Sequence, residues 1–198
     1  MAEVPTTRPS LLVRLRDPRD EPAWTEFVEI YEPVIYRLAR RRGFQDADAR
    51  ELAQEVLVAV ASAIERWEPD PGRGKFRTWL FCIARNLSIN LLASRRRHAQ
   101  GTGDTDFCAL LAQQPAPEGE ESEWFDREYK RELFERAAGQ VREEFREPTW
   151  RAFWMTGVEG KAIAEAAEML GISVGAVYVA RSRVMARLRA AIEQLDSR

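Results

Sequence analysis

The chain has 198 residues, an apolar content of 45%, a charged content of 31% and a formal net charge of −2 at pH 7. This length suits one large domain or two small ones, and the composition excludes a chain that is disordered throughout. Two cysteines, Cys82 and Cys108, are too few for a disulfide framework and suit a reducing compartment. Residues 1–10 lack the apolar core of a signal peptide, and no apolar run nears the roughly 20 residues of a membrane span. We therefore expect a soluble, cytoplasmic protein with no membrane partner.

Helical spacing of apolar residues dominates the first part of the chain, and strand signals are weak. We expect residues 1–20 to form an N-terminal extension and the residues Asp20 to Pro22 to begin a helix. Pro33 is expected to kink or split this helix, because proline removes a backbone donor. Gly43 is a candidate for its C-terminal cap.

The next helix is expected to begin at an aspartate and to run to residue 64. Asp46 or Asp48 can cap it, and Asp48 with Glu51 resembles a capping box. Two prolines and two glycines over residues 68–74 predict a loop. A third helical pattern follows over residues 76–97.

Basic and aromatic residues are interleaved from Asp70 to Asp104, a stretch with no acid between its ends. Cations attract phosphate, and flat rings can stack on unpaired bases. Opened, single-stranded nucleic acid is therefore the first ligand to consider. The cations are Arg73, Lys75, Arg77, Arg85, Arg95, Arg96 and Arg97, and the rings are Phe76, Trp79 and Phe81. The spacing favours Trp79 as a core residue rather than a stacking platform.

Residues 98–123 separate two helical halves. The span 99–123 holds six acids and no lysine or arginine, is rich in glycine and proline, and predicts a flexible acidic linker. Helical spacing resumes at about Trp124. The sequence therefore predicts an all-α protein with one helical domain over 21–97 and a second over 124–198.

A helix-turn-helix is predicted near the C-terminus. Two helices are expected over about 159–170 and 173–195, with Gly171 in a sharp turn and Ser173 capping the second helix. In such a motif the second helix enters the major groove of DNA. Its outward residues are candidates for contacts to base edges or phosphates: Ser173, Tyr178, Val179, Arg181, Ser182 and Arg183. The later arginines are expected to hold the phosphate backbone.

Three motifs together resemble a known family. Residues 76–86, FRTWLFCIARN, resemble the F-x-x-W-L-x-x-I-A-R-N signature of sigma factors, and residues 46–56 resemble their D-A-x-D-x-x-Q-E-V segment. Residues 162–188 are similar to the family's C-terminal helix-turn-helix, I-A-x-x-L-G-I-S-x-G-x-V. The three occur in family order and spacing. On these motifs the chain is identified as a member of the extracytoplasmic function (ECF) subfamily of sigma-70 factors.

The resemblance implies a bacterial initiation factor that gives core RNA polymerase its promoter specificity. The domain over 21–97 would correspond to sigma region 2 and that over 124–198 to sigma region 4. The implied partners are the β′ clamp helices and the β flap of polymerase, promoter DNA and an anti-sigma factor. The helix after residue 46 would bind the clamp helices through a polar stripe: Asp48, Arg50, Glu51, Gln54 and Glu55.

The resemblance also divides promoter reading between the domains. Residues 67–75 and the helix after them match the reader of the −10 element, where a base leaves the stack and enters a protein pocket. The residues expected to contact that element are Arg73, Lys75, Arg77, Arg85, Asn86, Arg95, Arg96 and Arg97. The second domain would read the −35 element as duplex. Tyr178 and Ala180 stand where the family often has lysine and arginine, so the −35 sequence cannot be carried over.

Two other classes compete with this interpretation. A helix-turn-helix regulator that binds duplex DNA without polymerase would explain the second domain, but not the basic and aromatic stretch over 76–97. An enzyme is disfavoured because His98 is the only histidine, so no histidine-based metal cluster or catalytic triad is available. We expect no catalytic residue, no metal site and no cofactor.

Overall fold

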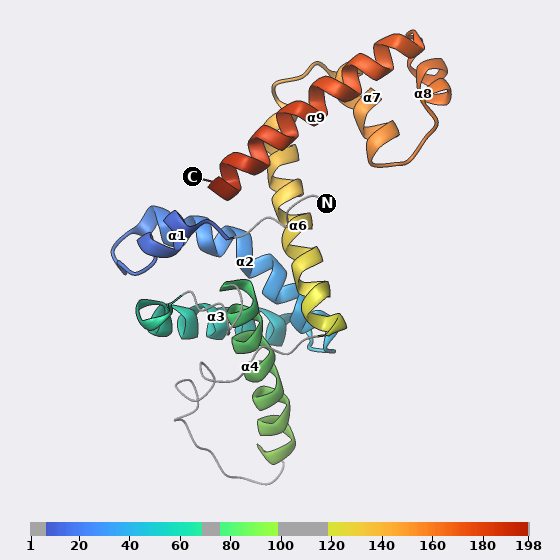
Figure 1. Ribbon diagram of the computed structural model, residues 1–198. Coiled ribbons are helices and arrows are strands. Elements are labelled where there is room, and N and C mark those ends of the chain that lie inside the picture. Colours follow the sequence, from blue (N-terminus) through green and yellow to red (C-terminus); the bar gives the residue numbers. More distant parts are fainter. Residues whose placement is uncertain (1–6, 69–75, 99–118, 198) are drawn as a thin grey trace. The chain divides into compact units, whose positions relative to one another are not determined.

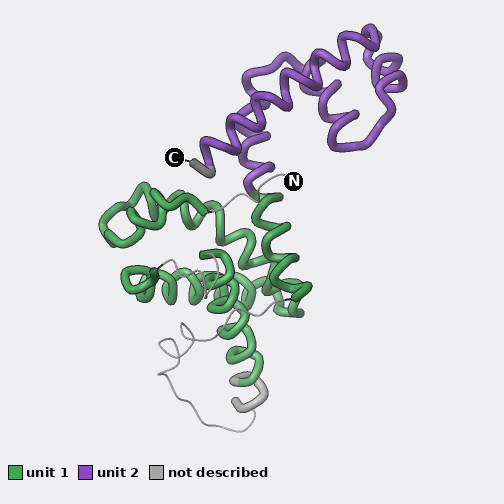
Figure 2. Tube along the Cα trace, viewed as in Figure 1, with its two compact units in different colours: residues 1–132 green, residues 133–198 purple. Residues whose placement is uncertain are grey.

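The computed structural model describes residues 7–68, 76–98 and 119–197, with the side chains of 94–98 and 196–197 left aside. The chain divides into two compact units, Met1–Glu132 and Leu133–Arg198, coloured separately in Figure 2. Within the described ranges every regular element is a helix (Figure 1), which confirms the all-α prediction. No single described helix is long and apolar enough to cross a membrane. The pair Ile163–Leu170 and Val174–Leu195 passes such a test by length and composition only when the two helices are taken together as one segment bent by 105°.

Unit 1 is a bundle of helices around an aromatic and aliphatic core. Its described elements are α1 (Pro9–Arg14), α2 (Glu21–Arg41), α3 (Asp46–Ala63), η1 (Ile64–Arg66), α4 (Phe76–His98) and the first part of α6 (Glu120–Arg142). Each long helix contributes one buried apolar face. The core includes Phe27, Tyr31, Val34, Ile35, Leu52, Val56, Val60, Phe76, Leu80, Phe81, Phe125 and Tyr129.

Helix α2 begins as the sequence predicts but does not split. The Asp20 carboxylate accepts a hydrogen bond from the Ala23 amide at 3.0 Å, and proline stands in the first turn. Pro33 lies inside one continuous helix of 21 residues. Proline costs a helix one hydrogen bond, but burial of the helix face that holds Phe27 and Tyr31 outweighs that loss.

The predicted capping box of α3 is wrong. The N-cap is Gln45, whose side chain makes no capping hydrogen bond, and the helix begins at Asp46. The Asp46 carboxylate instead accepts hydrogen bonds from Tyr36 Oη at 2.6 Å and from Arg50 Nε at 3.0 Å. An aspartate in the first turn still favours the helix through the macrodipole.

Residues 7–20, expected only as an extension, hold a short helix that belongs to the unit 1 core. Leu11, Leu12 and Leu15 are buried, and Thr7 shares a hydrogen bond with Tyr31. Arg8 forms a buried ion pair with Glu26 of α2. Neither the apolar triplet nor this ion pair follows a long periodic pattern, which is why the sequence did not predict the helix.

Helix α6 crosses the boundary between the units. Its residues 120–132 belong to unit 1 and its residues 133–142 to unit 2. The division between the units therefore falls after residue 132, whereas the sequence predicts a linker over 98–123 between the two domains. Glu120, Glu121 and Glu123, expected in a flexible linker, form the first turn of α6. Residues 99–118 lie outside the described residues.

Unit 2 has two apolar clusters. Its further helices are α7 (Glu147–Gly157), α8 (Ile163–Leu170) and α9 (Val174–Ser197). The first cluster joins α6, α7 and α9 through Val141, Trp150, Phe153, Val184 and Leu188. The second joins α7, α8 and α9 through Ala152, Met155, Ala166, Ala167 and Val177. Small alanines in the second cluster let α8 lie close to α7 and α9.

Candidate nucleic-acid interface

Helices α8 and α9 form the predicted helix-turn-helix (Figure 1). Gly171 follows α8 with φ of +64° and ψ of +32°, a left-handed conformation that glycine adopts without steric cost. Ser173 then caps α9, because its Oγ accepts a hydrogen bond from the Ala176 amide at 3.1 Å. The predicted turn glycine and capping serine are both confirmed.

Helix α9 presents one exposed face at its N-terminal end. Val177 is buried against α7 and α8, and Val184 is buried against α6 and α7. This turns Tyr178, Val179, Ser182 and Arg183 outward. The Arg181 side chain is half-buried. Ala180, which the sequence analysis compares with cationic family positions, is buried in the second cluster. The exposed residues are therefore the ones that a DNA groove can reach.

In unit 1, the residues of α4 that were expected to contact DNA have different surroundings. Arg85 is half-buried, and Asn86 is only 8% exposed. Arg77 is 2% exposed; its Nε donates to the Asp126 carboxylate at 2.7 Å, and its guanidinium lies 4.5 Å from the Tyr129 ring centroid. In this structure a phosphate cannot reach Arg77, because Asp126 and Tyr129 cover it. The expectation of an open Arg77 is therefore corrected.

Five other predicted contacts cannot be placed. Arg73 and Lys75 lie outside the described residues, and the side chains of Arg95, Arg96 and Arg97 are not described. They stay predictions from the sequence.

Aromatic rings join the two ends of the segment that holds Arg73 and Lys75. The ring centroids of Trp67 and Phe76 lie 5.4 Å apart at 89°, and Trp79 lies 5.4 Å from Phe76 and 6.1 Å from Trp67. Trp79 is half-buried, which agrees with a packing role. We call Trp67, Phe76 and Trp79 the aromatic stem. Phe76 continues it into the unit 1 core through Phe27, 6.0 Å away.

Arg16 was missed by the sequence analysis. Its Nη2 donates to the backbone carbonyl oxygen of Trp67 at 2.9 Å, across 51 positions of the chain. This bond joins the residues just after α1 to the aromatic stem. No local pattern could have indicated a contact over this separation.

The polar stripe of α3 lies on the surface as predicted. Arg50, Glu51, Gln54 and Glu55 are exposed, Asp48 is half-buried, and Leu52, Val56 and Val60 face the core. Val58 continues the stripe one turn later and is 66% exposed. An exposed valine among charges, on a face whose other side is packed, is a candidate contact for a partner. Val58 is not among the contacts that the sequence predicts.

Charges fix part of this stripe. The Arg50 guanidinium lies between the Asp46 carboxylate and the Tyr36 ring, 5.6 Å from its centroid. Hydrogen bonds from Tyr36 and Arg50 lower the pKa of the Asp46 carboxyl below its ordinary value. Partial burial, with the Glu51 carboxylate nearby, raises the pKa of Glu55. The stripe therefore holds one guanidinium with fixed partners, that of Arg50, and a carboxyl group, that of Glu55, whose charged form a cationic partner would stabilise.

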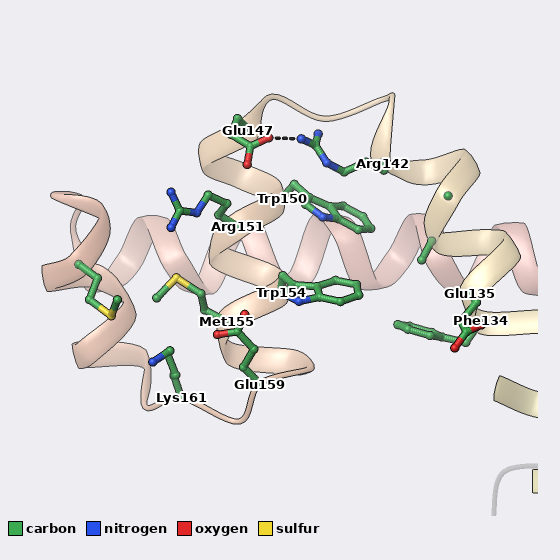
Figure 3. Close-up of a pocket in the computed structure, with 13 residues that line it drawn as sticks. Phe134, Glu135, Arg142, Glu147, Trp150, Arg151, Trp154, Met155, Glu159 and Lys161 are labelled. Carbon is green, nitrogen blue, oxygen red and sulfur yellow. Dashed lines mark hydrogen bonds and ion pairs between the residues drawn. The ribbon is translucent and has the colours of Figure 1, made fainter. Parts of the chain in front are cut away.

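Unit 2 carries an apolar groove of about 540 Å³ between α6, α7 and α8. Figure 3 shows the rings of Trp150 and Trp154 one above the other and directed toward α6; their centroids lie 5.8 Å apart. Phe134 lies across the groove from them, and an ion pair of Arg142 with Glu147 closes one end. The groove is apolar inside and charged at its rim. Among the described residues no cluster of three metal-ligating side chains occurs.

The described residues form two helical units, and the second holds a helix-turn-helix, a motif typical of DNA-binding proteins. The family model for Sigma-70 region 2 matches residues 27–98, and the model for Sigma-70, region 4 matches residues 150–188. The ECF RNA polymerase sigma factor ShbA of Streptomyces griseus is 30% identical over 201 residues, which cover 98% of this chain and 100% of that protein. The chain therefore belongs to the ECF sigma factors of the sigma-70 family.

Other relatives are matched over part of their length. ECF RNA polymerase sigma factor SigE of Mycolicibacterium smegmatis is 29% identical over 82% of this chain and 58% of that protein. ECF RNA polymerase sigma factor RpoE of Cereibacter sphaeroides is 33% identical over 44% of this chain and 48% of that protein. The chain thus spans about half the length of these two. The solved structure of CnrH in complex with the cytosolic domain of CnrY is 21% identical, covers 93% of this chain and 96% of that one, and has a TM-score of 0.37.

Proposed function

We propose that this chain is a promoter-specificity subunit that binds core RNA polymerase and directs it to start transcription at chosen promoters. The relatives SigE and ShbA are RNA polymerase sigma factors. One observation carries the proposal. The same chain holds a helix-turn-helix, whose helix α9 has an exposed face, and a stripe of exposed polar side chains on α3 that suits a protein partner. The proposed role is that of a DNA reader and not of an enzyme.

The α3 stripe is proposed as the contact for the β′ clamp helices. Asp48, Arg50, Glu51, Gln54 and Glu55 supply charge and hydrogen-bonding groups, and Val58 supplies an apolar centre. Interfaces of this kind place apolar residues at the centre and polar residues at the rim.

The apolar groove of unit 2 is proposed as the site for the β flap. Trp150, Trp154 and Phe134 offer the aromatic surface that anchors a partner helix. An anti-sigma partner stays a prediction from the family resemblance.

Unit 1 is proposed to read the −10 element through the opened strand. Arg73, Lys75 and Arg85 are the candidates, with Arg95, Arg96 and Arg97 on duplex phosphates upstream. Asn86 is 8% exposed and reaches a base only if the side chains around it move. Arg77 serves this role only if Asp126 moves away, because the two side chains are paired in the structure. In unit 2, Ser173, Tyr178, Val179, Arg181, Ser182 and Arg183 are proposed to contact the −35 duplex. Arg181 and Arg183 supply charge, and the exposed Tyr178 and Val179 supply apolar contact with the groove.

In vitro transcription tests the proposal. Purified chain is added to core polymerase with a promoter library, and the starts of the transcripts are sequenced. The proposal expects starts at a defined subset of promoters that core polymerase alone does not use. A regulator that acts without polymerase would bind duplex DNA but would not co-purify with core polymerase in the absence of DNA. Failure to bind core polymerase, or binding with no new starts, overturns the proposal.

A further inference from the structure

The first part of α6 lies against arginines of α2 and α4 in unit 1. Residues 120–132, which we call the acidic segment, hold six acidic and three basic residues. They belong to unit 1, although the helix continues into unit 2.

Four arginines of α2, α4 and the turn after α2 pair with the acidic segment. Arg37 Nε lies 2.6 Å from Glu128 Oε2, and Arg37 Nη2 lies 3.0 Å from Glu132 Oε2. The Glu121 carboxylate accepts two bonds from Arg42, at 2.8 and 2.6 Å. The remaining pairs are Arg77 with Asp126 at 2.7 Å and Arg41 with Glu120 at 4.0 Å.

These pairs lie next to the proposed −10 reader. Arg42 Nη1 donates to the backbone carbonyl oxygen of Arg85 at 3.1 Å and to Ser88 Oγ. One guanidinium therefore joins Glu121 of the acidic segment to the turn of α4 that holds Arg85 and Asn86. Arg77 lies in the first turns of the same helix.

Apolar contacts hold the acidic segment in place below the ion pairs. The rings of Tyr129 and Tyr31 are stacked with centroids 5.3 Å apart, and Phe125 lies 5.5 Å from Phe81. Phe125 and Tyr129 are both buried. The segment is therefore docked in the free protein, and its release needs a contribution from outside.

Carboxylates that pair with arginine occupy the positions that phosphates take in a nucleic-acid complex. We propose that the acidic segment is an autoinhibitory latch. In the free protein it neutralises the arginines beside α4, and its displacement in the polymerase complex opens them to the backbone of the separated DNA strand. This inference rests on the proposed function for the identity of the DNA and of the displacing partner.

Isosteric neutralisation tests the latch. The double variant Glu121→Gln, Asp126→Asn removes the two carboxylate charges that pair with Arg42 and Arg77. Glu123→Gln with Glu143→Gln is the matched control: both residues are exposed, and Glu123 pairs with Arg127 on its own helix. Both double variants raise the net charge equally, so an unspecific gain in DNA attraction affects them alike.

Fluorescence anisotropy of labelled oligo-dT at low salt measures binding by the free chain. We expect the latch variant to bind about 5-fold or more tightly than the control variant, and the two to agree within about 2-fold once each is bound to core polymerase. Hydrogen exchange at residues 120–132 should be faster in the latch variant.

Equal oligo-dT affinity of the two free variants overturns the latch, whether or not hydrogen exchange has changed. A gain that persists undiminished in the polymerase complex also overturns it, because displacement would then be absent. These outcomes differ from a failure of the proposed function, which appears as wild-type protein that starts no transcripts with core polymerase.

Discussion

Arg187 of α9 and Glu144, which follows α6, form an ion pair through two hydrogen bonds. Nε lies 2.6 Å from Oε2, and Nη2 lies 2.6 Å from Oε1. The later arginines of α9 are predicted to hold the DNA backbone. Arg187 also fastens α9 to the end of α6 inside unit 2, so Glu144 competes with phosphate for its guanidinium.

The pair predicts a pH dependence of stability in acid. Hydrogen bonding from Arg187 lowers the pKa of Glu144 below its ordinary 4.5. A lowered carboxyl pKa stabilises the folded state fully above the unfolded value and loses that effect as the pH falls through the folded value. Glu144→Gln should therefore lower the thermal midpoint of unit 2 at pH 7, and the difference should shrink below about pH 4.5. Glu143→Gln is the control; an equal and pH-independent shift in both variants contradicts the prediction.

Gly171→Ala should destabilise unit 2 by about 1–2 kcal/mol. The cost comes from the left-handed backbone, because a Cβ at this position meets no atom within 4 Å. Gly171→Asn should cost less, since asparagine tolerates this conformation. Urea unfolding followed by circular dichroism gives both values. Equal losses for alanine and asparagine would show that backbone conformation is not the cause.

Val58→Asp should weaken binding to core polymerase by about 10-fold, or about 1.4 kcal/mol. The change places a charge at the apolar centre of the α3 stripe, where an interface excludes water. Val13→Asp is a matched control, because Val13 of α1 is 64% exposed and Val58 is 66% exposed. Native gel titration with core polymerase measures both. A similar loss in the two variants would remove Val58 from the proposed contact.

Arg16→Ala should slow promoter opening by about 2- to 5-fold while polymerase binding stays unchanged. One hydrogen bond to a backbone carbonyl is worth about 0.5–1.5 kcal/mol, and this bond holds Trp67 at the start of the segment that carries Arg73 and Lys75. Permanganate footprinting of unpaired thymines follows the opening. Arg19→Ala removes the same charge from an exposed neighbour and should have no effect. Slower opening in both variants would mean that charge, and not the bond to Trp67, matters.

Local chemistry explains what the sequence could predict. The helix-turn-helix depends on Gly171, Ser173 and a buried line at helical spacing, all within one short segment, so composition and periodicity suffice. The start of α2 depends on Asp20 and the proline after it in the same way. The polar stripe of α3 follows from spacing alone, because an amphipathic helix must bury its apolar side.

Contacts between residues that are far apart in the chain explain what the sequence could not predict. Arg77 reads as a free cation in a basic stretch, but its partner Asp126 lies 49 positions away and its ring contact is Tyr129. Residues 119–123 read as part of a flexible linker, because their glycine and acids predict no apolar face. They form the first turn of α6, which Phe125 and Tyr129 anchor in the unit 1 core and where Glu121 pairs with Arg42. The order of α6 therefore depends on the tertiary structure.

The boundary inside α6 decides where the protein can be divided. A fragment that begins at Trp124, as the sequence would recommend, removes Phe125 and Tyr129 from the core to which they belong. The N-terminal piece then exposes the core rings of Tyr31 and Phe81 and leaves the guanidinium groups of Arg37 and Arg77 without their carboxylate partners, while the C-terminal piece carries Phe125 and Tyr129 without their core contacts. Both pieces are candidates for aggregation, whereas a cut after Glu132 leaves these rings with the unit in which they are buried.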